Sequence, residues 1–107
     1  MAEFPASILF CCDHNAVRSP MAEGMMKKLH GARVFVQSAG VKHDMNVDPF
    51  AVAACAEIGV ELTAHKVRSF EDLAMGGDQI DSYELIVALS PAAQRAALDQ
   101  TRWFATE

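Results

Sequence analysis

The chain has 107 residues, a mass of 11.6 kDa and a formal net charge of −5, from 14 acidic and 9 basic side chains. Its 51% hydrophobic and 21% charged residues are typical of a folded globular protein, and its length predicts one domain over residues 1–107. The acidic balance argues against a nucleic-acid partner, and no apolar run approaches the roughly 20 residues that span a bilayer.

The first third of the chain places one helix between two apolar runs. Residues 7–11 form a continuous apolar run, which is typical of a strand covered on both faces. A helix is predicted over residues 20–29, with Ser19 as its N-cap, a proline at its first position and Gly31 as its stop. A second apolar run at residues 34–36 predicts the next strand.

The rest of the chain continues this alternation. A helix is predicted over residues 49–58 after an Asp-Pro pair, and a short helical turn at 69–75 precedes a third apolar run at 85–89. A Ser-Pro pair begins a helix over residues 91–99, and residues 102–106 predict the start of a fourth strand. Strands that alternate with helices predict an α/β fold with a doubly wound parallel sheet in three layers.

The densest chemistry follows the first predicted strand, in residues 12–20, which read CDHNAVRSP. A loop that enters a helix presents free backbone N–H groups and a partial positive charge, so it suits a phosphate dianion. The same field stabilises a thiolate at Cys12, and the planar guanidinium of Arg18 can hold two phosphoryl oxygens. The spacing therefore predicts a phosphate-binding loop with a cysteine nucleophile.

The candidate residues also have ordinary structural interpretations. A cysteine after a buried strand is often a small core residue, and an arginine in a first helical turn is often solvated. Asn15 and Ser38 could satisfy local turns, and His65 alone is more typical of a structural or surface histidine. Only their combination favours function.

The cysteines and the N-terminus indicate a reducing compartment. The three cysteines are an odd number, two of them adjacent, and we expect Cys55 to be buried and inert in its alanine-rich helix. Residues 1–7 lack the pattern of a secretory signal. We therefore expect a cytoplasmic protein with no membrane partner. No His, Cys and carboxylate cluster shows ligand spacing, so we expect no metal and no cofactor.

The sequence resembles the low-molecular-weight protein tyrosine phosphatases over residues 7–101. The specific matches are ILFCC at 8–12, Asn15 and RSPMAEG at 18–24; the supporting matches are QSAG at 37–40, IGV at 58–60, HKVR at 65–68 and YELIVAL at 83–89. The resemblance implies a sheet of about four parallel strands in the order 2-1-3-4.

The resemblance also implies a role for each matching residue. Cys12 corresponds to the nucleophile that forms a phosphocysteine, Arg18 to the phosphate-binding residue, and Ser19 to the hydroxyl that supports the thiolate. Backbone N–H groups would bind the phosphoryl oxygens at Asp13, His14, Asn15, Ala16, Val17 and Arg18. A polar network that holds the loop in shape would comprise Asn15, Ser38 and His65.

Three departures from the family pattern concern catalysis. The general acid of the family, an aspartate before a proline that follows the fourth strand, has no counterpart in the 107 residues, because Asp48 precedes the only such proline and stands too early. We therefore expect a domain shortened at its C-terminus, with the last strand and helix incomplete and an open edge that would allow a dimer. His14 replaces the usual glycine, and Val17 replaces a second cysteine that would protect an oxidised nucleophile.

The implied function is a cysteine-dependent phosphatase. Its expected partners are a phosphorylated protein or small phosphomonoester of the phosphotyrosine type, and phosphate or another oxyanion. One alternative is a phosphate-binding or phosphoprotein-binding module that turns over poorly. The other is an arsenate reductase coupled to thioredoxin, which is disfavoured because residues 89–91 read Leu-Ser-Pro where those relatives need further cysteines.

Overall fold

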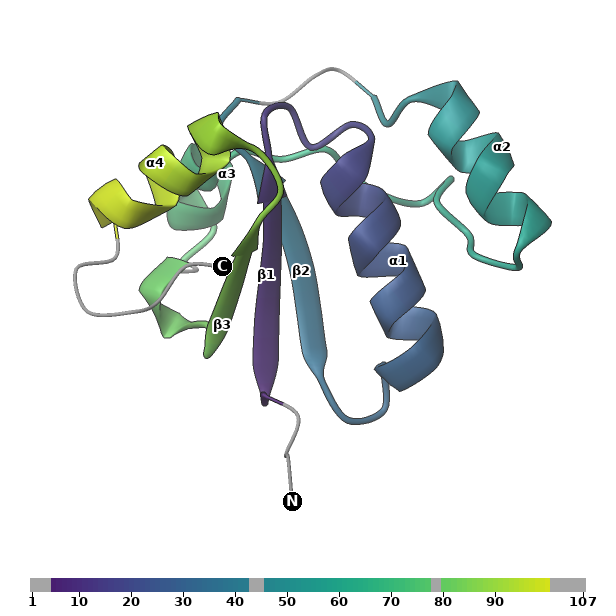
Figure 1. Cartoon of the computed structure of the whole chain (residues 1–107), viewed down its shortest axis with the longest axis horizontal. Coiled ribbons are helices and arrows are strands. Elements are labelled where there is room, and N and C mark those ends of the chain that lie inside the picture. Colours follow the sequence, from purple (N-terminus) through teal and green to yellow (C-terminus); the bar gives the residue numbers. More distant parts are fainter. Residues whose placement is uncertain (1–4, 43–45, 78–79, 101–107) are drawn as a thin grey trace.

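The computed structural model describes residues 5–42, 46–77 and 80–100. Three parallel strands form a sheet in the order β2-β1-β3, as Figure 1 shows. The strands are β1 (Ser7–Cys12), β2 (Phe35–Gly40) and β3 (Leu85–Ala88). The helices are α1 (Arg18–His30), α2 (Pro49–Glu57), α3 (Phe70–Met75) and α4 (Pro91–Gln100), with a 3₁₀ turn, η1, at Ile80–Ser82. The predicted α/β class is confirmed.

The central strand separates two hydrophobic layers. Ile8 and Phe10 point toward α1, where they pack with Val36, whereas Leu9 and Cys11 pack on the other face with residues of α3 and α4. Successive side chains of a strand point to opposite faces, so one buried strand supplies both layers. The three-layer arrangement is visible in Figure 1, with α1 on one side of the sheet and α3 and α4 on the other.

The sheet register brings the ends of the strands together at one edge. Cys12 pairs with Gly40 of β2, and Cys11 pairs with Ala88 of β3. Parallel sheets bind ligands outside the carboxyl ends of their strands. The segment that follows Cys12 therefore lies where a ligand site is expected.

Two predicted helix features were wrong. The first helix begins at Arg18 rather than at residue 20, and Ser19 is not its N-cap, because that hydroxyl is buried and bonds within the loop instead. Gly31 ends this helix as predicted, in a right-handed conformation with φ −60°, and a Cβ atom here would lie 2.4 Å from the carbonyl oxygen of Lys27. The second strand is also longer than predicted and extends to Gly40, since residues 37–40 pair with β1.

The predicted fourth strand at residues 102–106 lies outside the described residues. The order of the three described strands agrees with the first three places of the predicted 2-1-3-4. None of the helices in the described ranges has the length and hydrophobicity of a transmembrane helix.

Candidate active site

The loop between β1 and α1 is held closely against the end of β2. Backbone N–H groups of Val41 and Lys42 donate to the carbonyl oxygens of Cys12 and Asp13 at 3.0 Å each. A Cβ atom on Gly40 would lie 2.3 Å from the carbonyl oxygen of Lys42 and 2.7 Å from the backbone nitrogen of Asn15. Only glycine allows this approach, so Gly40 sets the position of the loop.

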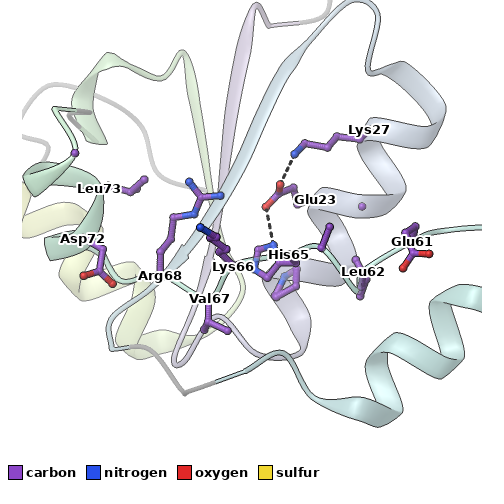
Figure 2. Close-up of a pocket in the computed structure, with 14 residues that line it drawn as sticks. Glu23, Lys27, Glu61, Leu62, His65, Lys66, Val67, Arg68, Asp72 and Leu73 are labelled. Atoms are coloured by element: carbon purple, nitrogen blue, oxygen red, sulfur yellow. Dashed lines mark hydrogen bonds and ion pairs between the residues drawn. The ribbon is translucent and has the colours of Figure 1, made fainter.

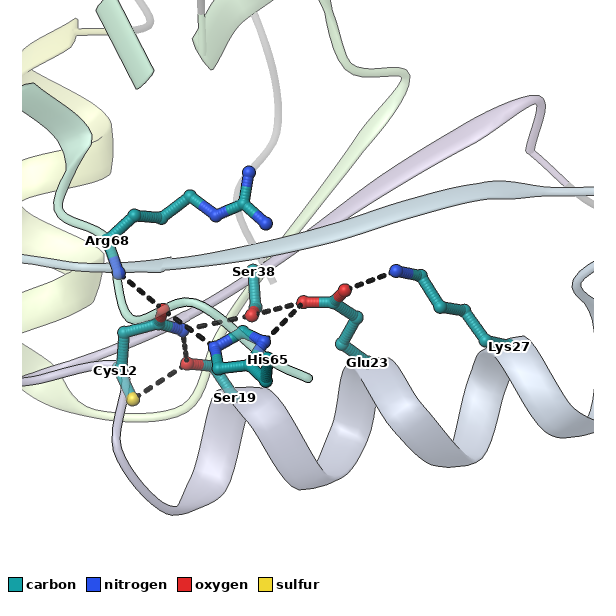
Figure 3. Close-up of polar contacts among 8 residues, drawn as sticks. Cys12, Ser19, Glu23, Lys27, Ser38, His65 and Arg68 are labelled. Carbon is teal, nitrogen blue, oxygen red and sulfur yellow. Dashed lines mark hydrogen bonds and ion pairs between the residues drawn. The ribbon is translucent and has the colours of Figure 1, made fainter. Parts of the chain in front are cut away.

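Cys12 ends β1 at the base of the loop. Its side chain is almost fully buried, and its Sγ atom lies 2.9 Å from Oγ of Ser19, in the first turn of α1. Figure 3 shows this contact as one end of a longer chain of polar contacts. A serine hydroxyl so placed can donate to a thiolate and stabilise its negative charge.

Asn15 is the centre of the network. Its backbone has φ 55°, a left-handed conformation that asparagine tolerates better than most residues. Its Nδ2 group donates to Oγ of Ser19 at 2.8 Å and to Oγ of Ser38 at 2.9 Å. Its Oδ1 atom accepts from the backbone N–H of Arg68 at 2.8 Å and from Nε2 of His65 at 3.1 Å. One fully buried side chain thus joins the loop to α1, β2 and residues 65–68.

Glu23 is a member of this network that the sequence analysis missed. It is buried on α1, where its Oε1 atom accepts from Oγ of Ser38 and lies 3.7 Å from Nδ1 of His65. Its Oε2 atom lies 2.5 Å from Nζ of Lys27. Glu23 and Lys27 are four residues apart, a spacing that usually indicates an exposed pair, so the sequence held no clear signal of burial.

The protonation of His65 depends on its burial. Burial lowers the pKa of His65 below its ordinary value of 6.5, the charge of Glu23 opposes this, and the charges of Arg68 and Lys27 lower it further. The net direction favours a neutral ring. A neutral ring can still donate from Nε2 to Asn15, so the network does not need a charged histidine.

A cavity of about 230 Å³ opens above Cys12. Its lining consists of Cys12, Asp13, His14, Ala16, Val17, Arg18 and Ser90. The lining does not include Asn15, Ser19, Ser38 or His65, whose hydrogen bonds to one another hold the loop in place. The arrangement places a buried sulfur at the base of the cavity and an arginine on its wall.

The end of β3 contributes two contacts that the sequence did not indicate. Nη1 of Arg18 donates to the carbonyl oxygen of Leu89 at 2.8 Å, and Oγ of Ser90 donates to Oδ1 of Asp13 at 2.5 Å. Both tie the loop to the neighbouring strand end. They arise from the β1–β3 pairing, which joins residues far apart in the sequence.

The other two cysteines are separate from this cavity. Cys11 is fully buried on the opposite face of β1, where burial, and then the charge of Cys12, raise the pKa of its thiol to about 12. Cys55 is fully buried between α2 and α1, as predicted. Among the described residues no group of three or more His, Cys, Asp or Glu could hold a metal ion.

The family model named low molecular weight phosphotyrosine protein phosphatase matches residues 7–105. Two curated relatives are "Glutaredoxin arsenate reductase" of Synechocystis, 29% identical over 82 residues, and the "Probable low molecular weight protein-tyrosine-phosphatase EpsP" of Ralstonia solanacearum, 28% identical over 90 residues. These matches cover 77% and 83% of this chain, but only 58% and 59% of the relatives. The chain therefore spans about three fifths of their length.

Solved structures share the fold. The tyrosine phosphatase amsI of Erwinia amylovora has a TM-score of 0.76 at 24% identity, over 92% of this chain and 63% of that protein. The arginine phosphatase YwlE has a TM-score of 0.72 at 29% identity, over 88% of this chain and 61% of that protein. The tyrosine phosphatase Wzb of Escherichia coli K30, solved with sulphate, has a TM-score of 0.75 at 24% identity, covering 92% and 66%.

Proposed function

We propose that this chain, which belongs to the low molecular weight phosphotyrosine protein phosphatase family, hydrolyses phosphomonoesters of the phosphotyrosine type through a phosphocysteine on Cys12. The observation that carries the proposal is the 2.9 Å contact between Sγ of Cys12 and Oγ of Ser19 below a cavity that Arg18 lines. A sulfur held in place beside a hydroxyl donor, at a cavity lined by the loop and by an arginine, is suited to attack a bound phosphoryl group.

The proposed reaction has two displacements. The thiolate of Cys12 attacks phosphorus, the S–P bond forms, and the P–O bond to the leaving group breaks. Water then attacks the phosphocysteine, the S–P bond breaks, and phosphate leaves while the hydroxyl of Ser19 stabilises the released thiolate. Arg18 binds two phosphoryl oxygens and offsets their charge in both transition states.

The leaving oxygen must receive a proton when its bond breaks. A general acid that supplies this proton typically contributes about 10²- to 10⁴-fold in rate. A phenolate with a low pKa needs this proton least. We therefore propose that this chain turns over aryl phosphates with acidic leaving groups faster than alkyl phosphates.

Arsenate reduction is the second candidate, because several curated relatives carry that name. Reduction of arsenate to arsenite takes two electrons, which two thiols can supply by forming a disulfide. The other two thiols are poorly placed to form a disulfide with Cys12. Cys11 points to the opposite face of β1, and Cys55 is buried between α2 and α1. Phosphoryl transfer needs only Cys12 and is the function we favour.

Hydrolysis of p-nitrophenyl phosphate by the 107-residue chain tests the proposal. We expect turnover in the wild type and in Cys55→Ala, and none in Cys12→Ser, because a serine at this position lacks the activated thiolate. Equal rates in the wild type and Cys12→Ser would overturn the proposal. A folded wild type that binds phosphate without turnover would instead support the phosphate-binding alternative.

A further inference from the structure

A second, larger cavity lies between α1 and α3, over the segment 61–68, and we call it the α1/α3 cavity (Figure 2). Its volume is about 590 Å³, within the range of small-molecule pockets. It shares no lining residue with the cavity above Cys12. Nothing in the proposed phosphatase reaction uses it.

Three cationic side chains surround its interior. Figure 2 shows Arg68 and Lys66 pointing into the gap between α1 and α3, and Lys27 reaching toward the same gap from α1. Lys27 already pairs with Glu23. Nε of Arg68 is buried and has no hydrogen-bond partner among the described residues. A buried donor without a partner costs free energy, which a bound acceptor would recover.

The anionic side chains of the lining are already engaged. Glu23 accepts from Ser38 and Lys27. Oε1 of Glu61 accepts from the backbone N–H of Thr63 at 2.7 Å, and Asp72 belongs to the capping box of α3. In Figure 2 the carboxylates of Glu61 and Asp72 point away from the gap. The lining has three basic and three acidic side chains, so its net charge is close to zero, and Arg68 and Lys66 are the cations that point into the gap.

We propose that the α1/α3 cavity binds a small polycarboxylate anion, with one carboxylate on Arg68 and Lys66 and a second near Lys27. The planar guanidinium edge fits a planar carboxylate with two parallel hydrogen bonds. A phosphate group would bind better in the loop after β1, where the N-terminus of α1 follows. In the α1/α3 cavity only side chains carry positive charge. The fixed charge of Glu23 also limits the charge that the ligand can carry.

His65 lines this cavity and also belongs to the polar network beside Cys12. Arg68 and Lys27 lower the pKa of His65, and an anion that neutralises them would raise it. His65 contacts Asn15, which contacts Ser19 beside Cys12. His65 therefore connects the lining of the α1/α3 cavity to the loop that holds Cys12.

Calorimetric titration with citrate tests the proposal on the 107-residue chain. We expect citrate to bind the wild type with one-to-one stoichiometry, and Arg68→Gln to weaken it by about tenfold or more, which corresponds to about 1.4 kcal/mol. The matched control is Arg18→Gln, which changes the arginine of the other cavity. Arg18→Gln should leave citrate binding unchanged and abolish the binding of inorganic phosphate. Arg68→Gln should still bind inorganic phosphate.

Other outcomes overturn the proposal. The first is that the wild type does not bind citrate at about 10 mM. The second is that Arg68→Gln and Lys66→Gln both bind citrate as tightly as the wild type, and the third is that only Arg18→Gln loses citrate binding. Loss of phosphate binding in Arg68→Gln would show a phosphoryl site instead. Lys66 is exposed, so Lys66→Gln keeps the test available if Arg68→Gln fails to fold. Binding needs no turnover, so failure of the phosphatase proposal would not decide this one.

Discussion

Asn15 joins four partners with one buried side chain, and the shape of the loop depends on all of them. Ser19 and Ser38 accept from its amide, while Arg68 and His65 donate to its oxygen. A side chain that saturates its hydrogen-bonding capacity in a dry environment fixes one conformation, because every alternative leaves a buried group without a partner. At the residue scale, the position of Cys12 thus follows from contacts behind the cavity.

Asn15→Ala should therefore weaken both fold and site. We expect the free energy of unfolding to fall by about 2 kcal/mol or more, since several buried partners lose a hydrogen bond. We also expect hydrolysis of p-nitrophenyl phosphate to fall by roughly 10²-fold, because a small misplacement of a nucleophile is costly. Asn46→Ala, at an exposed position, is the control for urea denaturation and kinetics. Equal effects of the two substitutions would contradict the role of Asn15.

His65 should make stability depend on pH. Because the pKa of His65 is lower in the folded chain than its ordinary 6.5, protonation favours the unfolded chain. The contribution of neutral His65 to the free energy of unfolding is fully present above about pH 6.5. It is lost as the pH falls toward the pKa of His65 in the folded chain. Urea denaturation of the wild type and of His65→Gln from pH 7.5 to 5 measures this. A difference between them that does not change with pH would exclude His65 as the titrating group.

The sequence predicted which helices and strands form, but not the residue at which α1 begins. Continuous apolar runs and Ser-Pro or Asp-Pro pairs predicted the strands and helices, since hydrophobic patterning and capping residues are local properties of the sequence. The start of α1 was misplaced because the hydroxyl of Ser19 bonds to Cys12 and Asn15 rather than capping. Glu23, Leu89 and Ser90 were missed because their roles arise from packing and strand pairing between distant segments.

The junction of β2 with the loop gives a prediction at the element scale. Gly40→Ala would place a Cβ against backbone atoms of Lys42 and Asn15 that cannot move separately from the sheet. We expect a loss of about 2 kcal/mol or more in stability, together with weaker phosphate binding. Gly76→Ala is the matched control, since its nearest contact would be an ordinary 3.5 Å. Thermal denaturation compares them, and a Gly40→Ala variant as stable as Gly76→Ala would refute the close approach.

At the scale of the whole molecule, the cavity above Cys12 lies at the carboxyl end of the sheet and the α1/α3 cavity lies along the edge beside β2. The chain is acidic overall, with a net charge of −5, yet both cavities contain arginine. Local charge, not net charge, therefore decides which anions can bind. Cys12 lines one cavity and Glu23 and His65 line the other, so the network of polar contacts in Figure 3 connects them.

The most direct measurement of the central claim is the rate at which iodoacetamide alkylates each cysteine, followed by mass spectrometry. We predict that Cys12 reacts fastest and that phosphate protects it, with protection lost in Arg18→Ala. Cys11, whose pKa is raised to about 12, and buried Cys55 should react slowly. Alkylation of Cys12 no faster than Cys55, with no protection by phosphate in a folded chain, would contradict an assembled phosphate-binding loop.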